Sequence, residues 1–215
     1  MLKPIKFLRQ FQMNEDGNAA VELLLVIPVL VWALLSTWVY FGAYHAESVS
    51  TRAGLTIADV ISRERSVNTE YLESMRHLLQ ELTDSDEDAQ LRVTLYSYDA
   101  DDDEYQVEWS EVILSESQID TGIPDDGPSL NAEVTDADLA AVEDRLPVMA
   151  NLQRSLLIET RTTYTAPFSI GLGPFLETNI EDLEFKTFTV ISPRNEITVC
   201  LDPTFSNPNS GDEEC

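Results

Sequence analysis

The sequence predicts an α+β protein, with a long N-terminal transmembrane helix that continues into a small antiparallel-sheet domain outside the cytoplasm. Three observations favour this class. The first is an apolar stretch long enough to cross a bilayer. The second is a helical repeat of apolar residues directly after it, and the third is a set of later segments that alternate apolar and polar residues. We expect the sheet to pack on the long helix.

The apolar stretch is predicted to form a transmembrane helix over residues 18–44. Residues 23–44 are 22 positions without Asp, Glu, Lys, Arg or His, and about 20 apolar residues span a bilayer as a helix. Pro28 removes one backbone donor, so we expect a bend that membrane helices tolerate. Aromatic residues gather in the second half, as in an interfacial belt: Trp32, Trp38, Tyr40, Phe41 and Tyr44.

The charges on either side of this helix predict its orientation. Residues 1–17 carry a net charge of +1, and the remaining 198 carry −27. The positive-inside rule therefore places residues 1–17 in the cytoplasm as a leader, with the domain of residues 45–202 and a polar tail of residues 203–215 outside. A removed secretory signal is disfavoured, because the apolar run is too long and bulky rings at 40–44 occupy the place of small residues.

The net charge of −26 also limits the partners. A domain this acidic repels phosphates, so nucleic-acid binding is not expected. The acidic surface is instead typical of a solvated domain.

The domain is predicted to begin with the continuation of the long helix and to end with strands. We expect a helix over 69–82, with Ser66 or Asn68 as its N-cap. The other expected elements are helical residues 46–62, a hairpin of 91–98 and 105–110 around an acidic loop 99–104, a loop over 115–131, a short helix over 136–146, and strands 156–165 and 185–191.

No catalytic, metal or cofactor site is predicted. The acidic segments 84–88 and 99–104 lack the ligand order of a calcium-binding loop, and charge runs usually stay hydrated. The two histidines, His45 and His77, stand in no recognisable nucleophile, zinc or phosphate-binding pattern. We therefore do not expect an enzyme.

Two cysteines, Cys200 and Cys215, lie within the last sixteen residues. The predicted topology puts them in a compartment where disulfides persist. A bridge between them would stabilise by roughly 3 kcal/mol in the chain-entropy model. The other interpretation is two free thiols on a frayed tail.

Glu22 is the most informative residue. It lies five residues after Gly17, beside an apolar run, and a carboxylate at a membrane-helix centre costs about 2.5–3.5 kcal/mol. The segment of residues 17–28, Gly-Asn-Ala-Ala-Val-Glu-Leu-Leu-Leu-Val-Ile-Pro, resembles the N-terminus of TadE-like minor pilins, or pseudopilins, of the bacterial tight-adherence (Flp) pilus system. Looser likenesses to the family's last strands occur at 158–167 and 188–194.

The resemblance implies cleavage between Gly17 and Asn18 by an inner-membrane prepilin peptidase, which makes Glu22 the fifth mature residue. Asn18 departs from the phenylalanine common at this position. Leu23 stands where major Flp pilins carry tyrosine, so a minor subunit is favoured. In the family, the carboxylate is thought to pair with the new N-terminal amine of a neighbouring subunit, where it compensates an otherwise expensive charge.

The implied function is a structural subunit of pilus assembly that supports surface adhesion. Its implied location is the bacterial inner membrane, as a single-pass protein with a periplasmic, pilin-like domain. The implied partners are the peptidase, other pilin-like subunits and the assembly machinery. A second class stays open, namely a permanently anchored periplasmic binding module. Leader processing distinguishes the two, because an anchored module need not lose residues 1–17.

Overall fold

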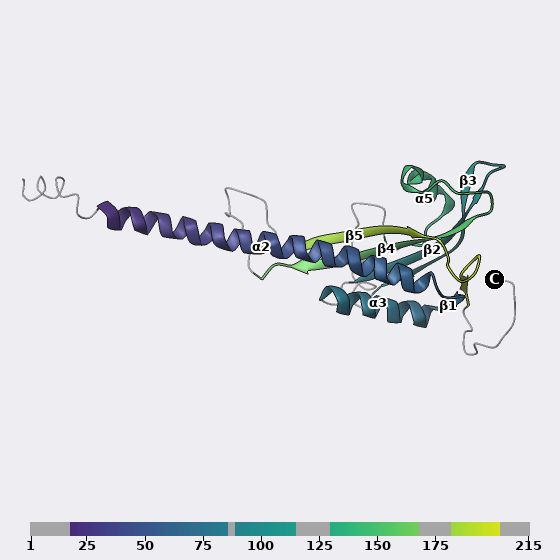
Figure 1. Cartoon of the computed structure of the whole chain (residues 1–215), viewed down its shortest axis with the longest axis horizontal. Helices are drawn as coiled ribbons and strands as arrows, with labels where there is room; N and C mark the ends of the chain where they lie inside the picture. The colour runs from purple at the N-terminus through teal and green to yellow at the C-terminus, as the bar shows by residue number, and fades with distance from the viewer. Residues whose placement is uncertain (1–17, 86–88, 115–129, 168–181, 203–215) are drawn as a thin grey trace, which may run out of the picture. The chain divides into compact units, whose positions relative to one another are not determined.

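The computed structural model describes residues 18–85, 89–114, 130–167 and 182–202. The chain divides into two compact units, residues 1–42 with 166–181, and residues 43–165 with 182–215. The helix α2 (Asn18–Ile61) contributes to both units (Figure 1). The other elements are β1 (Ser66–Val67), α3 (Thr69–Thr83), β2 (Gln90–Asp99), β3 (Glu104–Ile113), α5 (Asp136–Ala141), the 3₁₀ turn η2 (Glu143–Arg145), β4 (Arg154–Thr165), β5 (Asp182–Ile191) and β6 (Cys200–Leu201).

The helix α2 is 44 residues long and contains Pro28. Its first half is apolar, and among the described residues α2 is the one helix long and apolar enough to cross a membrane. An antiparallel sheet follows it along the chain. The predicted mixed class, a long apolar N-terminal helix followed by an antiparallel sheet, is thus confirmed. Proline costs this helix one backbone hydrogen bond, to the carbonyl four residues earlier.

The sheet has the strand order β3-β2-β4-β5 and every neighbouring pair is antiparallel. The predicted hairpin is present as β2 and β3, paired from Leu91 with Ile113 to Asp99 with Glu104. A bulge interrupts this pairing between Leu95 and Tyr96. Strands β4 and β5 begin earlier than the sequence predicts, at Arg154 rather than residue 156 and at Asp182 rather than residue 185. In this order, β3 and β5 are the edge strands of the sheet.

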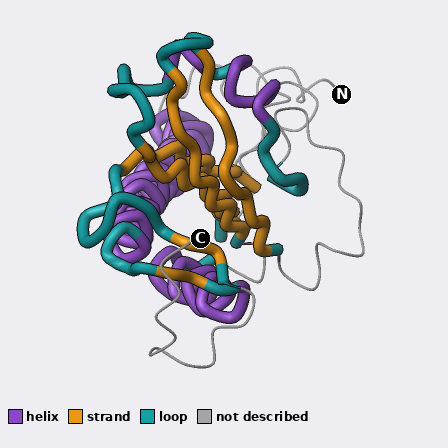
Figure 2. The backbone as a smooth tube through the Cα atoms, turned by 90° about the vertical axis from the view of Figure 1, so that its right-hand side faces the viewer, coloured by secondary structure: helices purple, strands orange, loops and turns teal. Residues whose placement is uncertain are grey.

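One face of the sheet packs against helices. The segment 43–61 of α2 and the helix α3 lie on the same side of the strands (Figure 2). Asn68, one of the two predicted N-caps, caps α3: its side-chain oxygen accepts a hydrogen bond of 2.8 Å from the Tyr71 amide. The core on this face comprises Ala53, Ile57, Ala58, Ile61, Val67, Leu72, Leu79, Ala89, Leu91, Val93, Leu95, Ile113, Leu156, Ile158 and Val199.

The opposite face of the sheet carries a second, smaller core. It is covered by α5, η2 and the chain that follows them, through the buried residues Tyr96, Val134, Leu139, Leu146, Met149 and Leu157. The predicted helix over 136–146 is present as α5 followed by the 3₁₀ turn. Thr135 and Asp138 form a capping box at its start, and this hydrogen bonding by Thr135 lowers the pKa of Asp138. The sheet is therefore buried on both faces.

A two-stranded parallel pair, β1 with β6, joins the C-terminal segment to the end of α2. The amide of Cys200 donates to the Arg65 carbonyl at 3.0 Å, and the amide of Asp202 donates to the Val67 carbonyl at 2.9 Å. The indole N–H of Trp109 donates to the Val199 carbonyl at 2.9 Å. These bonds fix residues 199–202 to the domain that the sheet builds.

Candidate functional site

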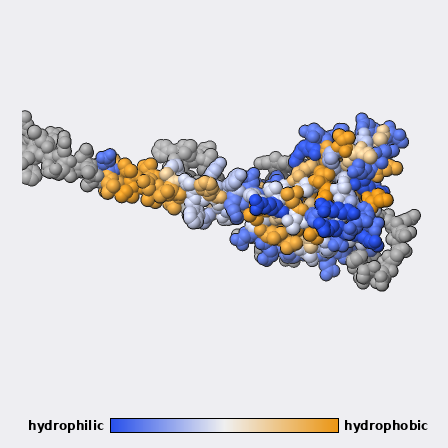
Figure 3. Space-filling view, viewed as in Figure 1, coloured by the Kyte–Doolittle hydropathy of each residue, from blue (hydrophilic) through white to orange (hydrophobic). Residues whose placement is uncertain are grey.

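Residues 21–38 of α2 form an apolar surface whose large side chains are exposed. Leu24 is 71% exposed and Leu25 is 64% exposed, and only 6% of the most apolar stretch is buried. Figure 3 shows apolar residues gathered along this part of the helix. Large apolar side chains gain free energy on leaving water, about 1.5–3 kcal/mol each when fully buried. A helix that is apolar on all sides is therefore stable where lipid or other helices surround it.

Glu22 lies at the N-terminal end of this surface. The helix is described from Asn18, so Glu22 is four residues further along it. Residues at this spacing lie on the same side of a helix and are about 6 Å apart along its axis. Glu22 is exposed and makes no ion pair with any other residue that the structure describes. Gly17, the other side of the predicted cleavage bond, lies outside the described residues.

Further along α2, the Thr37 hydroxyl is hydrogen-bonded within the helix. Its hydroxyl donates to the Ala33 carbonyl at 2.8 Å, one helical turn earlier. This bond removes the cost of an unpaired hydroxyl in an apolar medium. Glu22 differs from Thr37. It is the one carboxylate from Asn18 to Tyr44, and an ionised carboxylate has no donor with which to hydrogen-bond the backbone carbonyls of its own helix.

The second half of the helix approaches the sheet closely. A side-chain carbon placed on Gly54 would lie 2.7 Å from the Thr187 hydroxyl, so only glycine fits here without a shift of the neighbours. The Ser50 hydroxyl lies 2.9 Å from that of Thr162, and the Thr160 hydroxyl lies 2.6 Å from that of Thr187. Small residues on this face thus allow the helix backbone to lie directly against β4 and β5.

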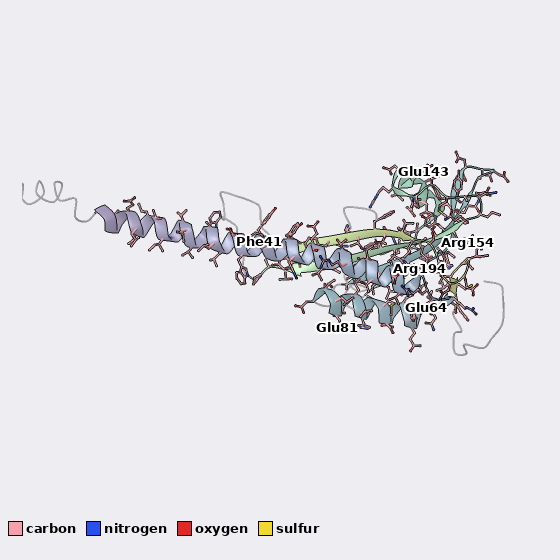
Figure 4. All side chains as sticks on the ribbon, in the orientation of Figure 1. Phe41, Glu64, Glu81, Glu143, Arg154 and Arg194 are labelled. Carbon is pink, nitrogen blue, oxygen red and sulfur yellow. The ribbon has the colours of Figure 1, made fainter. Side chains whose placement is uncertain are left out.

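The end of α2 is fastened by charged side chains. Asp59 accepts from Arg63 at 2.7 Å and from Arg194 at 2.9 Å. The Arg194 amide also donates to the Ser62 carbonyl at 2.7 Å, and Figure 4 shows this residue beside the C-terminal end of the helix. Nearby, burial and then the adjacent Glu64 raise the pKa of Tyr71 to about 12. That hydroxyl stays protonated at physiological pH.

Ion pairs between side chains of the sheet escaped prediction. Arg92 of β2 and Glu159 of β4 face each other, with 2.6 Å between guanidinium and carboxylate, and both side chains are nearly buried. Arg161 pairs with Glu184 of β5; the Arg161 side chain is nearly buried, whereas that of Glu184 is 43% exposed. The Arg92 guanidinium also donates to the Ala132 carbonyl at 3.0 Å. The sequence signal for these ion pairs was the alternation of charged residues along the predicted strands. Whether two such residues lie opposite each other depends on the strand register, which the sequence pattern does not give.

The acidic loop between β2 and β3 is a solvated turn in the structure. The Asp101 amide donates to the Asp99 carboxylate at 2.9 Å, and the Tyr98 hydroxyl donates to Asp103. This bond to Asp103 raises the pKa of Tyr98. Within the described ranges, no three His, Cys, Asp or Glu side chains are grouped so that they could hold a metal ion.

The structure describes one of the two cysteines of the predicted disulfide. Cys200 lies in β6 and is not a free thiol. Cys215 lies outside the described residues, so the Cys200–Cys215 pairing stays a prediction.

Comparison of the chain with protein-family models, with curated proteins and with solved structures found no match.

Proposed function

We propose that this chain is a minor pilin-like, or pseudopilin-like, structural subunit of a tight-adherence (Flp) pilus, which supports surface adhesion from the bacterial inner membrane. One observation carries the proposal. A single helix of 44 residues presents a bare apolar surface with a carboxylate near its start, and then packs on an antiparallel sheet. The apolar half suits a bilayer or a bundle of like helices, and the sheet suits a domain on the periplasmic side.

The first step is removal of the leader. A prepilin peptidase hydrolyses the bond between Gly17 and Asn18. Water supplies a hydroxyl to the Gly17 carbonyl, which leaves as a carboxylate, and the nitrogen of Asn18 becomes a free ammonium. The leader takes Lys3, Lys6 and Arg9 with it. These cations hold the N-terminus at the cytoplasmic face, so their loss lowers the cost of withdrawing the helix from the bilayer.

The second step is pairing of the new ammonium with Glu22 of a neighbouring helix. Before cleavage that nitrogen belongs to an uncharged amide, so the pairing depends on processing. An unpaired carboxylate costs about 2.5–3.5 kcal/mol at the centre of a membrane helix, and an adjacent ammonium offsets this. Because Asn18 and Glu22 are four residues apart, the pairing staggers adjacent helices by about 6 Å along their axes.

An anchored periplasmic binding module is the second candidate. The observation in its favour is a concave pocket of about 440 Å³ in the domain, between β5 and the chain after η2. Such a module needs the apolar helix only as an anchor, and it needs neither cleavage nor Glu22.

A bacterial strain lacking this chain tests the proposal, when complemented with wild type, Glu22→Ala or Glu47→Ala. Glu47 is the matched control, since it is an exposed carboxylate on the second half of the same helix. We expect Glu22→Ala to insert normally, because removal of a charge lowers the insertion cost. It should nevertheless fail to restore surface pili and attachment, whereas Glu47→Ala restores both. Full restoration by Glu22→Ala would exclude the pairing step.

The proposed topology also predicts a bridge between Cys200 and Cys215, because both would lie in the oxidising periplasm. Cys200→Ser should mainly expose residues 203–215 to proteases, since they follow the last strand pair at the chain end. Mass spectrometry of alkylated, unreduced protein from the native host decides this: two labelled thiols would show that the bridge is absent.

A further inference from the structure

A concave pocket lies on the face of the sheet that carries the second core. Its volume is about 440 Å³, within the range of about 300–1,000 Å³ that is typical of small-molecule sites. Met149 and Ser155 line it and are 6% and 1% exposed, whereas Val148 at its rim is 99% exposed. The pocket therefore opens to solvent and reaches down to buried side chains.

The lining of the pocket changes its character along β5. Phe188 and Val190 of this strand, and Ser192 directly after it, stand at every second position, so they line the pocket in this order. The four residues from the first to the last span about 13 Å at the rise of a strand. The pocket thus has an aromatic end, an aliphatic middle and a hydroxyl end.

The aromatic end carries a guanidinium group. The Arg145 guanidinium carbon lies 4.0 Å from the Phe188 ring centre, and this contact leaves N–H donors free for an anion. Arg145 makes no ion pair with any residue that the structure describes. It is also the only charged residue among the described residues of the lining, although the chain has 39 acidic and 13 basic residues. This end of the pocket therefore attracts an anion, which the net charge of the chain as a whole repels.

Hydroxyl groups gather at the other end. The Ser155 and Ser192 hydroxyl oxygens are 3.5 Å apart, which is long for a hydrogen bond. The Tyr96 hydroxyl beside Ser155 is buried and has no well-formed hydrogen bond to any described residue. A serine hydroxyl can accept one hydrogen bond while it donates another. An oxygen atom of a ligand at this end would therefore complete a chain that runs from Tyr96 through Ser155.

We propose that this pocket binds a small organic carboxylate that has an apolar chain and a hydroxyl or carbonyl oxygen at its far end. The carboxylate pairs with Arg145, the chain lies against Val190 and Met149, and the far oxygen bonds to Ser155 and Ser192. A neutral apolar ligand would remove water from the guanidinium without pairing it, so it fits less well. The proposal depends neither on cleavage of the leader nor on pilus assembly, since every residue involved lies in the sheet domain.

Methyl NMR of the full chain in detergent micelles tests the proposal, with 8-hydroxyoctanoate as the probe. The probe should shift the methyl signals of Met149 and Val190 but not that of Ile57, which lies in the core on the other face of the sheet. Octane-1,8-diol lacks the carboxylate and should bind about tenfold more weakly, because hydrogen bonds between charged groups are the stronger ones. Octanoate lacks the far hydroxyl and should bind about threefold more weakly.

Two variants test which end of the ligand lies where. Arg145→Gln should weaken binding of both carboxylates about tenfold and leave the diol unchanged, whereas Ser192→Ala should weaken 8-hydroxyoctanoate about threefold and leave octanoate unchanged. Arg65→Gln is the matched control, since this side chain is 80% exposed, pairs with Glu196 and does not line the pocket. All proteins are compared in the same micelles, so that uptake of a probe by the detergent cancels.

The Ile57 methyl signal, unchanged from wild type, shows that each variant is folded. The proposal is overturned if the probe shifts neither Met149 nor Val190, or if the diol binds as tightly as the carboxylates. It is also overturned if Arg145→Gln and Arg65→Gln bind the probe alike, or if Ser192→Ala weakens both carboxylates equally.

Discussion

The two halves of α2 are one helix in two different surroundings. The large apolar side chains of residues 21–38 are exposed, whereas Val39 is fully buried. Residues 43–61 present small residues to β4 and β5 and bury Ala53, Ile57 and Ile61 completely or nearly so. The same backbone thus serves two kinds of contact. Packing within the chain requires complementary shape, whereas the proposed function requires of the first half only an apolar environment and a partner for the charge of Glu22.

The comparison predicts that truncation of a large side chain matters in the second half and not in the first. Ile57→Ala should lower the free energy of unfolding of the domain by about 2–5 kcal/mol, because it leaves a cavity in the core under the helix. Leu25→Ala removes a similar volume from the exposed half and should change it by less than about 0.5 kcal/mol. Denaturant unfolding followed by the tryptophan signal of the sheet domain measures both, and equal losses would contradict the comparison.

Replacing a glycine in each half of α2 should also affect domain stability differently, with a smaller difference than the truncations of large side chains. Alanine is the better helix former by about 1 kcal/mol, yet Gly54→Ala should destabilise the domain by about 1–3 kcal/mol, because the new carbon meets the Thr187 hydroxyl at 2.7 Å. Thr187→Ala in the same chain should recover part of this loss. Gly42→Ala is the control in the first half, and it should not lower domain stability. If Gly54→Ala proved neutral in thermal unfolding, the helix would not lie as close to the sheet as described.

The smallest expected effect is a pH dependence in the second core. The capping bonds with Thr135 lower the pKa of Asp138 below its ordinary 3.8. The ionised form therefore stabilises the fold fully above about pH 4, and this contribution is lost as the pH falls through the lowered pKa. Asp138→Asn should lower the melting temperature slightly at pH 7, and the difference from wild type should shrink below about pH 4. A difference that grows on acidification would reverse the assignment.

Sequence periodicity predicted the helices and the four strands of the larger sheet because each has a local cause, but it did not predict β1 and β6. The apolar run and its helical continuation set α2, Asn68 began α3, and the alternation around the acidic loop gave the β2–β3 hairpin. The burial of both sheet faces was not predictable in this way. Arg92 and Thr94 in β2 indicate a solvated face, yet both are buried, because Glu159 and Ser110 from distant positions pair with them. Such pairs depend on register, which local patterns do not contain.

The candidate site divides in the same way. Glu22 was predicted from sequence because a lone carboxylate beside an apolar run is costly, and the Gly17–Asn18 bond was predicted from the resemblance to TadE-like pilins; both stay predictions. The close approach at Gly54 was not predicted, because it depends on where β5 lies relative to α2. Only the three-dimensional arrangement shows which glycine meets a side chain.

The proposed function depends most on processing of the leader, and intact-mass analysis with N-terminal sequencing tests this step directly. The full chain is expressed in membranes with a prepilin peptidase, and in parallel with a catalytically inactive peptidase. We expect the mature protein to begin at Asn18 with the active enzyme and at Met1 without it. A chain that keeps residues 1–17 beside an active peptidase would contradict the account and favour the anchored binding module.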